Sequence, residues 1–328
     1  MDRNKLVVVF GASGFIGRHA VRALAKQGWR VRAVCRRPYR ANYLLPAGQV
    51  GQIQLVKGNV NDDDDVARAM EGAGAAVNAT GVLFGHGEQG FEAINTDAPR
   101  RIAAAARAAG IETLVHISAI GADPDADSSY AQSKGCGERS VREEFPQATI
   151  LRPSLVFGPE DMFFNKFASL ARFTPVLPLI GGGHTRFQPV WVADVADAIV
   201  RSLTVPETRG ETYELGGPSV YTFKELLEFI LRETGRRPLL VSIPFALASL
   251  KAFFLQIPAF ILPVAPLLTM DQVTLLKSDN VVHEGARTLA DLRIIPAAME
   301  AIVPGYIWRF HPKGQFGHAE RTESGTTA

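Results

Sequence analysis

The stretch Val7–Gly17, "VVVFGASGFIG", places three glycines directly after an apolar run and before a helix-length segment. Glycines at such a turn let the chain bend tightly and let main-chain amides approach a pyrophosphate at a helix N-terminus. A bare strand-to-helix turn is the alternative, but the position between a buried strand and an amphipathic helix favours a dinucleotide site. The candidate binding residues of this turn are Gly11, Ser13, Gly14, Phe15, Ile16 and Gly17.

Apolar, β-branched runs alternate with helix-length segments through the first half of the chain. This alternation indicates a parallel sheet that is covered on both faces. The acidic run at 62–65 is expected to cap and begin a helix, since acids in a first turn suit the helix dipole. The sequence therefore predicts an α/β fold, a Rossmann-type doubly wound parallel sheet with a smaller, mostly helical C-terminal lobe. The expected strands are 6–10, 31–35, 53–56, 75–79, 114–118 and 149–151, and the expected helices are 18–27, 65–72, 99–109 and 130–144.

The regular alternation loosens after residue 151, which predicts a second structural part. We expect a Rossmann domain over 1–155, continued by about 186–217. Residues 156–185 and 218–313 would form the smaller lobe. The polar, small-residue end, 314–328, is expected to be a flexible tail.

Composition excludes several classes of protein. The 35 basic and 33 acidic residues give a net charge of +2, which does not indicate a nucleic-acid-binding protein. Two cysteines favour a reducing compartment, and the seven scattered histidines form no metal-ligand motif, so no metal is expected. The N-terminus shows no signal-peptide pattern, which predicts a cytoplasmic chain.

The second expected strand ends in "VCRRP", with Arg36 and Arg37 where NAD-preferring folds usually carry an acid. Two guanidinium groups suit a 2′-phosphate by charge and by geometry. The pair therefore predicts NADPH (NADP) rather than NAD, and a solvated pair of surface arginines is the alternative.

The stretch 116–134, "HISAIGADPDADSSYAQSK", ends in Tyr130 and Lys134, four residues apart on one face of an expected helix. An ammonium near a phenol stabilises the phenolate, which makes a proton donor or acceptor near neutral pH. The pair follows the fifth expected strand, at the carboxyl end of the sheet where ligands bind.

The motifs "GASGFIG", "GNVND", "NATG", "HISAIGA", "YAQSK" and "LRPSLVFGP" follow one another in the order seen in extended or atypical short-chain dehydrogenases/reductases, which the chain resembles over residues 5 to about 217. The resemblance implies a catalytic pair, Tyr130 and Lys134. It also implies cofactor contacts near the adenine, along the ribose and beside the nicotinamide, formed respectively by Asn59 and Val60, by Ala79, Thr80 and Gly81, and by Pro153 to Val156.

The chain departs from this family at Ala119, where active extended members usually carry Ser or Thr. Alanine cannot hydrogen-bond a substrate oxygen, and the loss of one such donor costs about 10²–10³ in rate. Ser118 is the candidate substitute if the register differs. Otherwise Tyr130 and Lys134 would only hold the cofactor.

The second half, including "FQPVWVADVADAI" and "PLLTMDQVTLLKSDNVV", is similar to the NADPH-binding accessory subunits of respiratory complex I, whose bacterial relatives are often labelled NAD-dependent epimerase/dehydratase. This resemblance covers residues 5 to about 310. It implies a structural cofactor, complex I subunits as partners, and a peripheral position on the cytoplasmic side of the bacterial inner membrane. A soluble cytoplasmic chain is the alternative.

Residues 239–268 form an unusually apolar segment that prolines at 244, 258, 263 and 266 are expected to break into short helices. Such helices suit a membrane surface or an apolar partner better than a membrane span, and an ordinary lobe core is the alternative. Two functions remain open. One is a complex I accessory subunit without turnover; the other is an NADP(H)-dependent oxidoreductase of an apolar substrate, as in ubiquinone biosynthesis.

Overall fold

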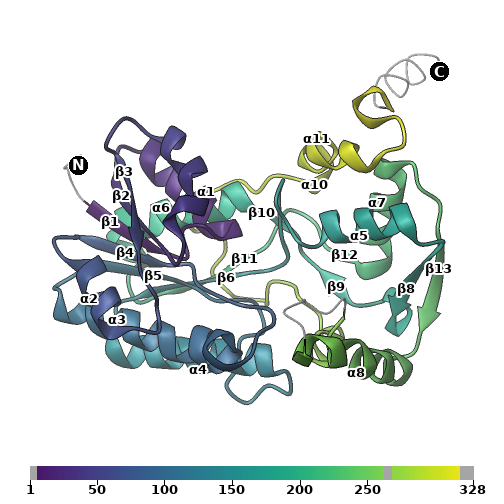
Figure 1. The fold of residues 1–328 in the computed structure, drawn as a ribbon, viewed down its shortest axis with the longest axis horizontal. Coiled ribbons are helices and arrows are strands. Elements are labelled where there is room, and N and C mark those ends of the chain that lie inside the picture. Colours follow the sequence, from purple (N-terminus) through teal and green to yellow (C-terminus); the bar gives the residue numbers. More distant parts are fainter. Residues whose placement is uncertain (1–5, 262–267, 318–328) are drawn as a thin grey trace. The chain divides into compact units, whose positions relative to one another are not determined.

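The computed structural model describes residues 6–261 and 268–317. By its internal contacts the chain divides into two compact units, coloured along the sequence in Figure 1. Unit 1 comprises residues 1–153, 192–215 and 282–295, and unit 2 comprises 154–191, 216–281 and 296–328.

Unit 1 is built on a seven-stranded sheet in the order β11-β6-β5-β4-β1-β2-β3. Every neighbouring pair in this sheet is parallel, which confirms the predicted α/β class. The strands are β1 (Leu6–Phe10), β2 (Arg30–Cys35), β3 (Ile53–Lys57), β4 (Ala75–Asn78), β5 (Thr113–Ile117), β6 (Thr149–Pro153) and β11 (Thr212–Leu215).

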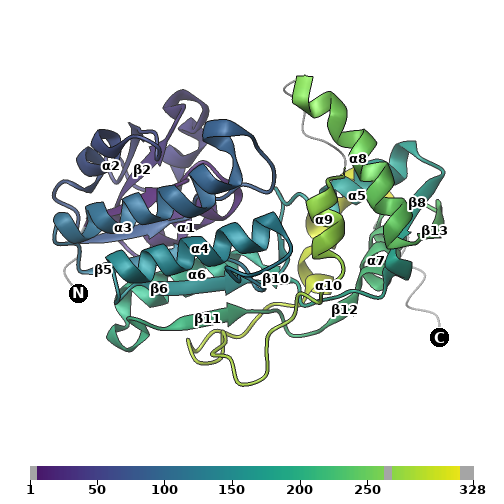
Figure 2. The ribbon, with the colours of Figure 1, turned by 90° about the horizontal axis from the view of Figure 1, so that it is seen from below.

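Helices cover both faces of this sheet, as Figures 1 and 2 show. One face carries α1 (Phe15–Lys26) and α6 (Val192–Thr204), and the other carries α2 (Asp63–Met70), α3 (Ala98–Ala108) and α4 (Ser129–Glu144). Buried side chains from the second group of helices meet alternate residues of the strands, among them Val8, Phe10 and Leu114. The acidic run begins α2 as expected, with the Asp62 carboxylate accepting a hydrogen bond from the Asp65 amide.

Two local features of unit 1 differ from the sequence expectation. Helix α1 begins at Phe15 rather than at residue 18, so Phe15 and Ile16 belong to its first turn. A π-helical stretch, Glu92–Asp97, precedes α3, and the sequence had not predicted it. Such wide turns often occur where a helix is adapted to a functional site.

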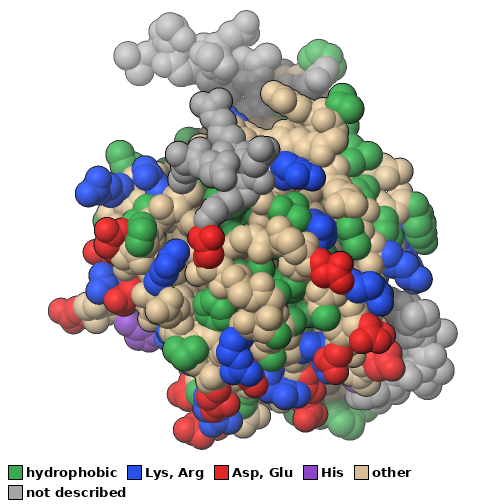
Figure 3. All heavy atoms as spheres, turned by 90° about the vertical axis from the view of Figure 1, so that its left-hand side faces the viewer, with side chains coloured by type: hydrophobic (Ala, Val, Ile, Leu, Met, Phe, Trp, Pro, Cys, Tyr) green, Lys and Arg blue, Asp and Glu red, His purple; other side chains and the backbone are tan. Residues whose placement is uncertain are grey.

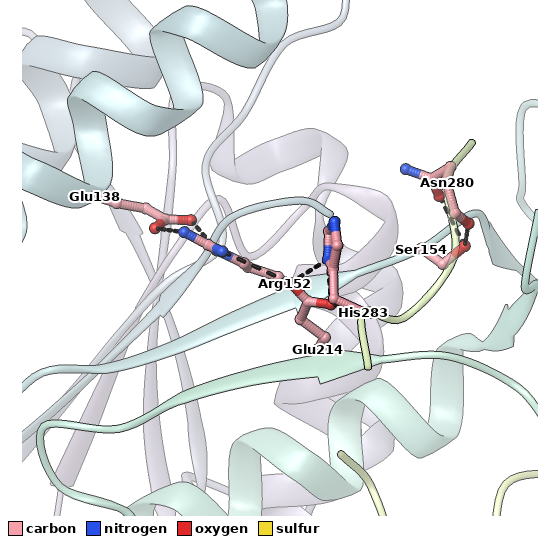
Figure 4. A network of polar contacts seen from close by, with 6 residues as sticks. All are labelled: Glu138, Arg152, Ser154, Glu214, Asn280 and His283. Carbon is pink, nitrogen blue, oxygen red and sulfur yellow. Dashed lines mark hydrogen bonds and ion pairs between the residues drawn. The ribbon is translucent and has the colours of Figure 1, made fainter. Parts of the chain in front are cut away.

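An ion-pair network holds the edge of unit 1 together (Figure 4). Arg152 on β6 binds both carboxylate oxygens of Glu138 on α4, at 2.8 and 2.6 Å, and lies 3.6 Å from Glu214 on β11. Glu214 also accepts hydrogen bonds from the main chain and the ring of His283, both at 2.8 Å. The network therefore fixes residues 282–295 to unit 1.

Unit 2 contains three two-stranded sheets and several short helices around an aromatic core. The strand pairs are β7 (Val156–Phe157) with β10 (Val190–Trp191), β9 (Arg186–Phe187) with β12 (Tyr221–Thr222), and β8 (Val176–Ile180) with β13 (Leu239–Ile243). The helices are α5 (Phe164–Phe173), α7 (Phe223–Thr234), α8 (Phe245–Ile261), α9 (Met270–Leu275), α10 (Met299–Ile302) and α11 (Pro304–Ile307). Phe164, Phe223, Phe229 and Tyr306 are among the buried residues of the core.

Helix α8 continues through Pro258, although this proline was expected to interrupt the helix. Pro244 does end the preceding strand, because β13 stops at Ile243 and α8 starts at Phe245. The prolines at 263 and 266 lie outside the described residues, as does most of the expected tail. Over the described ranges, no helix combines the length and the apolar character that crossing a bilayer requires.

Figure 3 shows one face of the molecule, the left-hand side of Figure 1. Basic and acidic side chains are interspersed over this face, and neither sign gathers into a continuous patch. The distribution agrees with the small net charge of +2.

Candidate functional site

The glycine-rich turn between β1 and α1 has no room for side chains. Gly11 has φ +73°, and a Cβ there would lie 2.7 Å from the carbonyl oxygen of Ala79. A Cβ on Gly17 would lie 2.1 Å from the carbonyl oxygen of Gly11. Real Cβ atoms do not approach backbone this closely, so both positions require glycine. The turn and the loop after β4 are therefore in direct main-chain contact.

Arg18 and Tyr43 brace the outside of this turn. The Arg18 guanidinium donates to the carbonyl oxygens of Ser13 and Gly14 at 3.1 and 3.2 Å, and it lies 4.8 Å from the centre of the Tyr43 ring. The Tyr43 hydroxyl donates to the Ser13 carbonyl at 3.0 Å. No acid occupies the first turn of α1, and its N-cap, Gly14, offers no side chain. The main-chain N–H groups of that turn are suited to an anion such as a pyrophosphate.

Arg36 and Arg37 follow β2 directly, and both are exposed. Nη1 of Arg36 donates to the side-chain oxygen of Gln89. Within the described part of the chain, neither arginine forms an ion pair with a carboxylate. Neither positive charge is therefore neutralised by an ion pair with the residues that the structure describes.

The loops after β3 and β4 lie at the same edge of the sheet as the glycine-rich turn. The Asn59 amide donates to Asp65, while the Asn59 side chain accepts from the Asn61 amide at 3.2 Å. The carbonyl oxygen of Val60 accepts from Arg101 at 3.1 Å.

Asn78, the last residue of β4, shapes the loop that contains Ala79, Thr80 and Gly81. Its side-chain oxygen accepts from the amide and the hydroxyl of Thr80, at 3.0 and 2.6 Å. Its side-chain nitrogen donates to Nδ1 of His116, the residue opposite it on β5, at 3.1 Å. The strand end and the loop are thus joined by one side chain.

Lys134 is buried on α4, with 4% of its surface exposed. Its ammonium donates to the carbonyl oxygen of Ile117 at 3.1 Å, and a Cβ on Gly81 would lie 3.1 Å from Nζ. Burial lowers the pKa of Lys134 to about 8, an effect that the charge of Glu138 partly offsets. Tyr130, half-buried, meets the Phe91 ring edge to face at 6.1 Å.

Two buried polar atoms of β5 and its extension have no partner among the described residues, Nε2 of His116 and Oγ of Ser118. Since residues 116 and 118 are two apart on an extended chain, they point to the same face of the sheet. Burial lowers the pKa of His116 to about 3, so the ring is neutral, and the charge of Lys134 acts in the same direction. Unsatisfied buried polar atoms are costly, and they are typical of a site that a ligand or water completes.

Asn95 lies in the π-helical stretch and was not identified from the sequence. It is fully buried; its side chain donates to the Val82 carbonyl and to the Ser133 hydroxyl, and accepts from the Val82 amide. A Cβ on Gly137 would lie 2.1 Å from the Asn95 carbonyl, which explains that glycine on α4. Little in the sequence signals this role, because Asn95 stands among other polar residues in the stretch 91–99, "FEAINTDAP".

Ala119 is partly buried directly after Ser118, and it brings no hydroxyl to the site. Pro153 ends β6 in unit 1, and Val156 begins β7 in unit 2. The predicted roles of Pro153 and Val156 beside a nicotinamide stay predictions. Among the described residues, no group of three His, Cys, Asp or Glu side chains could hold a metal ion.

The residues of unit 1 fit a dinucleotide. The glycines leave a cradle that a Cβ would fill, the first turn of α1 presents free main-chain donors, and Lys134 presents a buried ammonium. A bound nicotinamide would supply hydride chemistry. The proton-transfer role of Tyr130 and Lys134 stays a prediction from the sequence.

We expect the burial of Lys134 to appear in the pH dependence of stability. Below pH 8 the folded protein carries a buried charge, which costs up to about 3 kcal/mol relative to the ordinary pKa of 10.5. Between pH 8 and 10.5 the unfolded chain binds the extra proton, so stability should rise with pH. Lys134→Met should remove that rise. It should also increase the free energy of unfolding at pH 7, by an amount reduced by the loss of the hydrogen bond from Lys134 to the Ile117 carbonyl.

Urea denaturation from pH 7 to 10.5 measures this effect. Lys224→Met, at an exposed lysine of α7, is the control and should keep the wild-type profile. Parallel profiles for wild type and Lys134→Met would contradict the assignment.

The chain is similar to several known proteins. The model of the protein family described as "NAD dependent epimerase/dehydratase family" matches residues 7–216 of this chain. The chain is 32% identical to "NADH dehydrogenase [ubiquinone] 1 alpha subcomplex subunit 9, mitochondrial" of Arabidopsis thaliana, over 94% of this chain and 79% of that protein. It is also 32% identical to "Ceramide reductase" of Caulobacter vibrioides, over 74% of this chain and 75% of that one.

The crystal structure of gox2253 shares the fold, with a TM-score of 0.69 and 21% identity, over 93% of this chain and 97% of that one. The family match covers both the glycine-rich turn and the Tyr130–Lys134 pair. The chain therefore belongs to the NAD dependent epimerase/dehydratase family.

Proposed function

We propose that this chain is an NADPH-binding accessory subunit of respiratory complex I that holds its cofactor without turnover. The observation that carries the proposal is the similarity to a complex I subunit along 94% of the chain, which includes most of unit 2. Unit 2 lies largely outside the family match at residues 7–216, so this likeness goes beyond a shared nucleotide fold.

Ala119 supports binding without turnover. A hydroxyl at this position would hydrogen-bond a substrate oxygen, and its absence removes a contribution of about 10²–10³ in rate. Ser118, the candidate substitute, has a buried Oγ without a partner among the described residues, and its ability to replace that hydroxyl stays a prediction. Cofactor binding itself requires only the turn, the loops and Lys134, all of which are intact.

NADPH is proposed over NADH because of Arg36 and Arg37. Both are exposed at the end of β2, and no carboxylate of the described residues neutralises them. An acid at this edge would repel a 2′-phosphate, whereas guanidinium groups bind it through charge-assisted hydrogen bonds.

Helix α8 supports the proposed membrane-surface contact of residues 239–268. Two of its small residues, Ala248 and Ala252, are buried, while four of its large apolar residues are exposed. This is the reverse of an ordinary amphipathic helix of a soluble domain. The exposed residues are Leu247, Leu250, Phe253 and Phe254, each more than half exposed. Such a surface suits the interface of a lipid bilayer, with Lys251 able to extend toward headgroups.

A second candidate is an NADP(H)-dependent reductase of an apolar, lipid-like substrate. The intact Tyr130–Lys134 pair favours it, as does the 32% identity to the bacterial ceramide reductase. The exposed apolar residues of α8 would then face a lipid substrate rather than only a membrane.

The deciding experiment is purification of the native chain from its own membranes in mild detergent, followed by mass spectrometry of proteins and nucleotide. We expect complex I subunits in stoichiometric amounts, together with NADPH. A chain that purifies alone, with an NADPH-dependent reductase activity that Tyr130→Phe abolishes, would instead establish the second candidate.

The arginine pair gives a separate prediction. Arg36→Ala with Arg37→Ala should weaken NADPH binding by about tenfold or more, since charge-assisted hydrogen bonds to the phosphate are lost, and should leave NADH nearly unchanged. Calorimetric titration of both nucleotides measures this effect. Equal losses for the two nucleotides would show that the arginines do not bind the 2′-phosphate.

For the membrane contact, Phe253→Ser with Phe254→Ser should lower binding to vesicles of phosphatidylethanolamine and phosphatidylglycerol by about tenfold or more. The control is Phe173→Ser, at an exposed phenylalanine on α5. Flotation of the vesicles with bound protein provides the measurement. Unchanged flotation of the double variant would exclude α8 as the contact.

A further inference from the structure

The loop of residues 82–90, "VLFGHGEQG", follows β4 and the residues Ala79 to Gly81, which are proposed to line the cofactor. It is folded on itself rather than extended. The Gln89 amide donates to the His86 carbonyl at 3.1 Å, and the Gly90 amide donates to the Gly87 carbonyl at 2.9 Å. A Cβ on Gly85 would lie 1.8 Å from the Gln89 carbonyl, so the loop closes only with glycine there.

Two side chains tie this loop to the neighbouring strand ends. The Asn61 side chain, from the loop after β3, donates to the Glu88 carbonyl at 2.6 Å. Arg36, directly after β2, donates through Nη1 to the side-chain oxygen of Gln89. Since β2 and β3 are adjacent in the sheet, both hydrogen bonds lie toward the same end of its carboxyl edge.

Both polar atoms of the Gln89 side-chain amide form hydrogen bonds, which fix its orientation. Its nitrogen donates to the Glu88 carbonyl at 3.0 Å, which leaves its oxygen facing the Arg36 guanidinium. An amide oxygen is a neutral acceptor, so it holds the guanidinium without neutralising it. Arg36 keeps its full charge and its remaining N–H donors.

Arg18, which also lies near the turn, is differently engaged. Arg18 directs Nε and Nη2 to the carbonyl oxygens of Gly14 and Ser13, and it stacks on Tyr43. Two nitrogen atoms of the Arg18 guanidinium are therefore occupied by hydrogen bonds to the main chain. Arg36 is the arginine that the protein orients while leaving most of its donors open.

We propose that Gln89 is a specificity-determining residue for the 2′-phosphate of the cofactor, because it pre-orients Arg36 from the loop of residues 82–90. This inference rests on the proposed NADPH binding. Orientation before binding reduces the entropy that a long side chain loses when it meets the phosphate. NADH, which has no 2′-phosphate, gains nothing from it.

The experiment is a double-mutant cycle on full-length protein, with NADPH and NADH titrated by calorimetry. Gln89→Ala should weaken NADPH binding about three- to tenfold, the range that one hydrogen bond contributes, and leave NADH unchanged. In an Arg36→Ala background, Gln89→Ala should have no further effect on NADPH. The control, Gln49→Ala, removes an exposed glutamine side chain of the same unit and should change neither nucleotide.

Three results would overturn the inference. Tighter NADPH binding by Gln89→Ala would show that Gln89 competes with the phosphate for Arg36. Equal weakening of both nucleotides would show a general role of the loop, and an effect that persists without Arg36 would show that the two residues act separately. A wild-type protein that binds NADPH and NADH equally would instead refute the proposed cofactor preference.

Discussion

The main-chain contact between the glycine-rich turn and the loop after β4 is the constraint on which unit 1 depends. Gly17 lies against the Gly11 carbonyl, and Gly11 lies against the Ala79 carbonyl, with no room for a methyl group at either position. These contacts set the start of α1 and bring its N-terminus to the carboxyl edge of the sheet. The same absence of side chains leaves main-chain donors open to a phosphate. Fold and nucleotide site therefore have one physical origin.

The groups beside this contact are arranged at the expense of stability. Lys134 is buried as an ammonium whose pKa falls to about 8, and Nε2 of His116 and Oγ of Ser118 are buried without partners within the described chain. A core selected only for stability would place apolar residues of similar volume at these positions. Retention of the polar groups is understandable if a ligand supplies acceptors when it binds, because a satisfied network is far less costly than an orphaned one.

Sequence reasoning predicted the parallel sheet because buried strands are apolar over their whole length, as in Val7–Phe10, and because acids and glycines mark helix ends. It did not predict the π-helical stretch that contains Asn95, since local propensity does not distinguish that turn from an ordinary helix. It also missed the loop that presents Gln89, because the contact with Arg36 joins residues 53 positions apart. The return of residues 282–295 to unit 1 depends likewise on a long-range pair, Glu214 with His283.

The residues that hold a cofactor do not by themselves separate an enzyme from a binding subunit. An enzyme and a subunit that keeps NADPH in place need the same glycines, the same arginines and the same Lys134. Only groups that touch a substrate would differ, and position 119, which is proposed to be one of them, carries no hydroxyl. The exposed phenylalanines of α8 are not needed for nucleotide binding either, and an exposed apolar surface is typical of a contact with a partner or a membrane. The two proposed functions therefore differ in what they require at position 119 and at the apolar surface of α8, and not in the residues proposed to hold the cofactor.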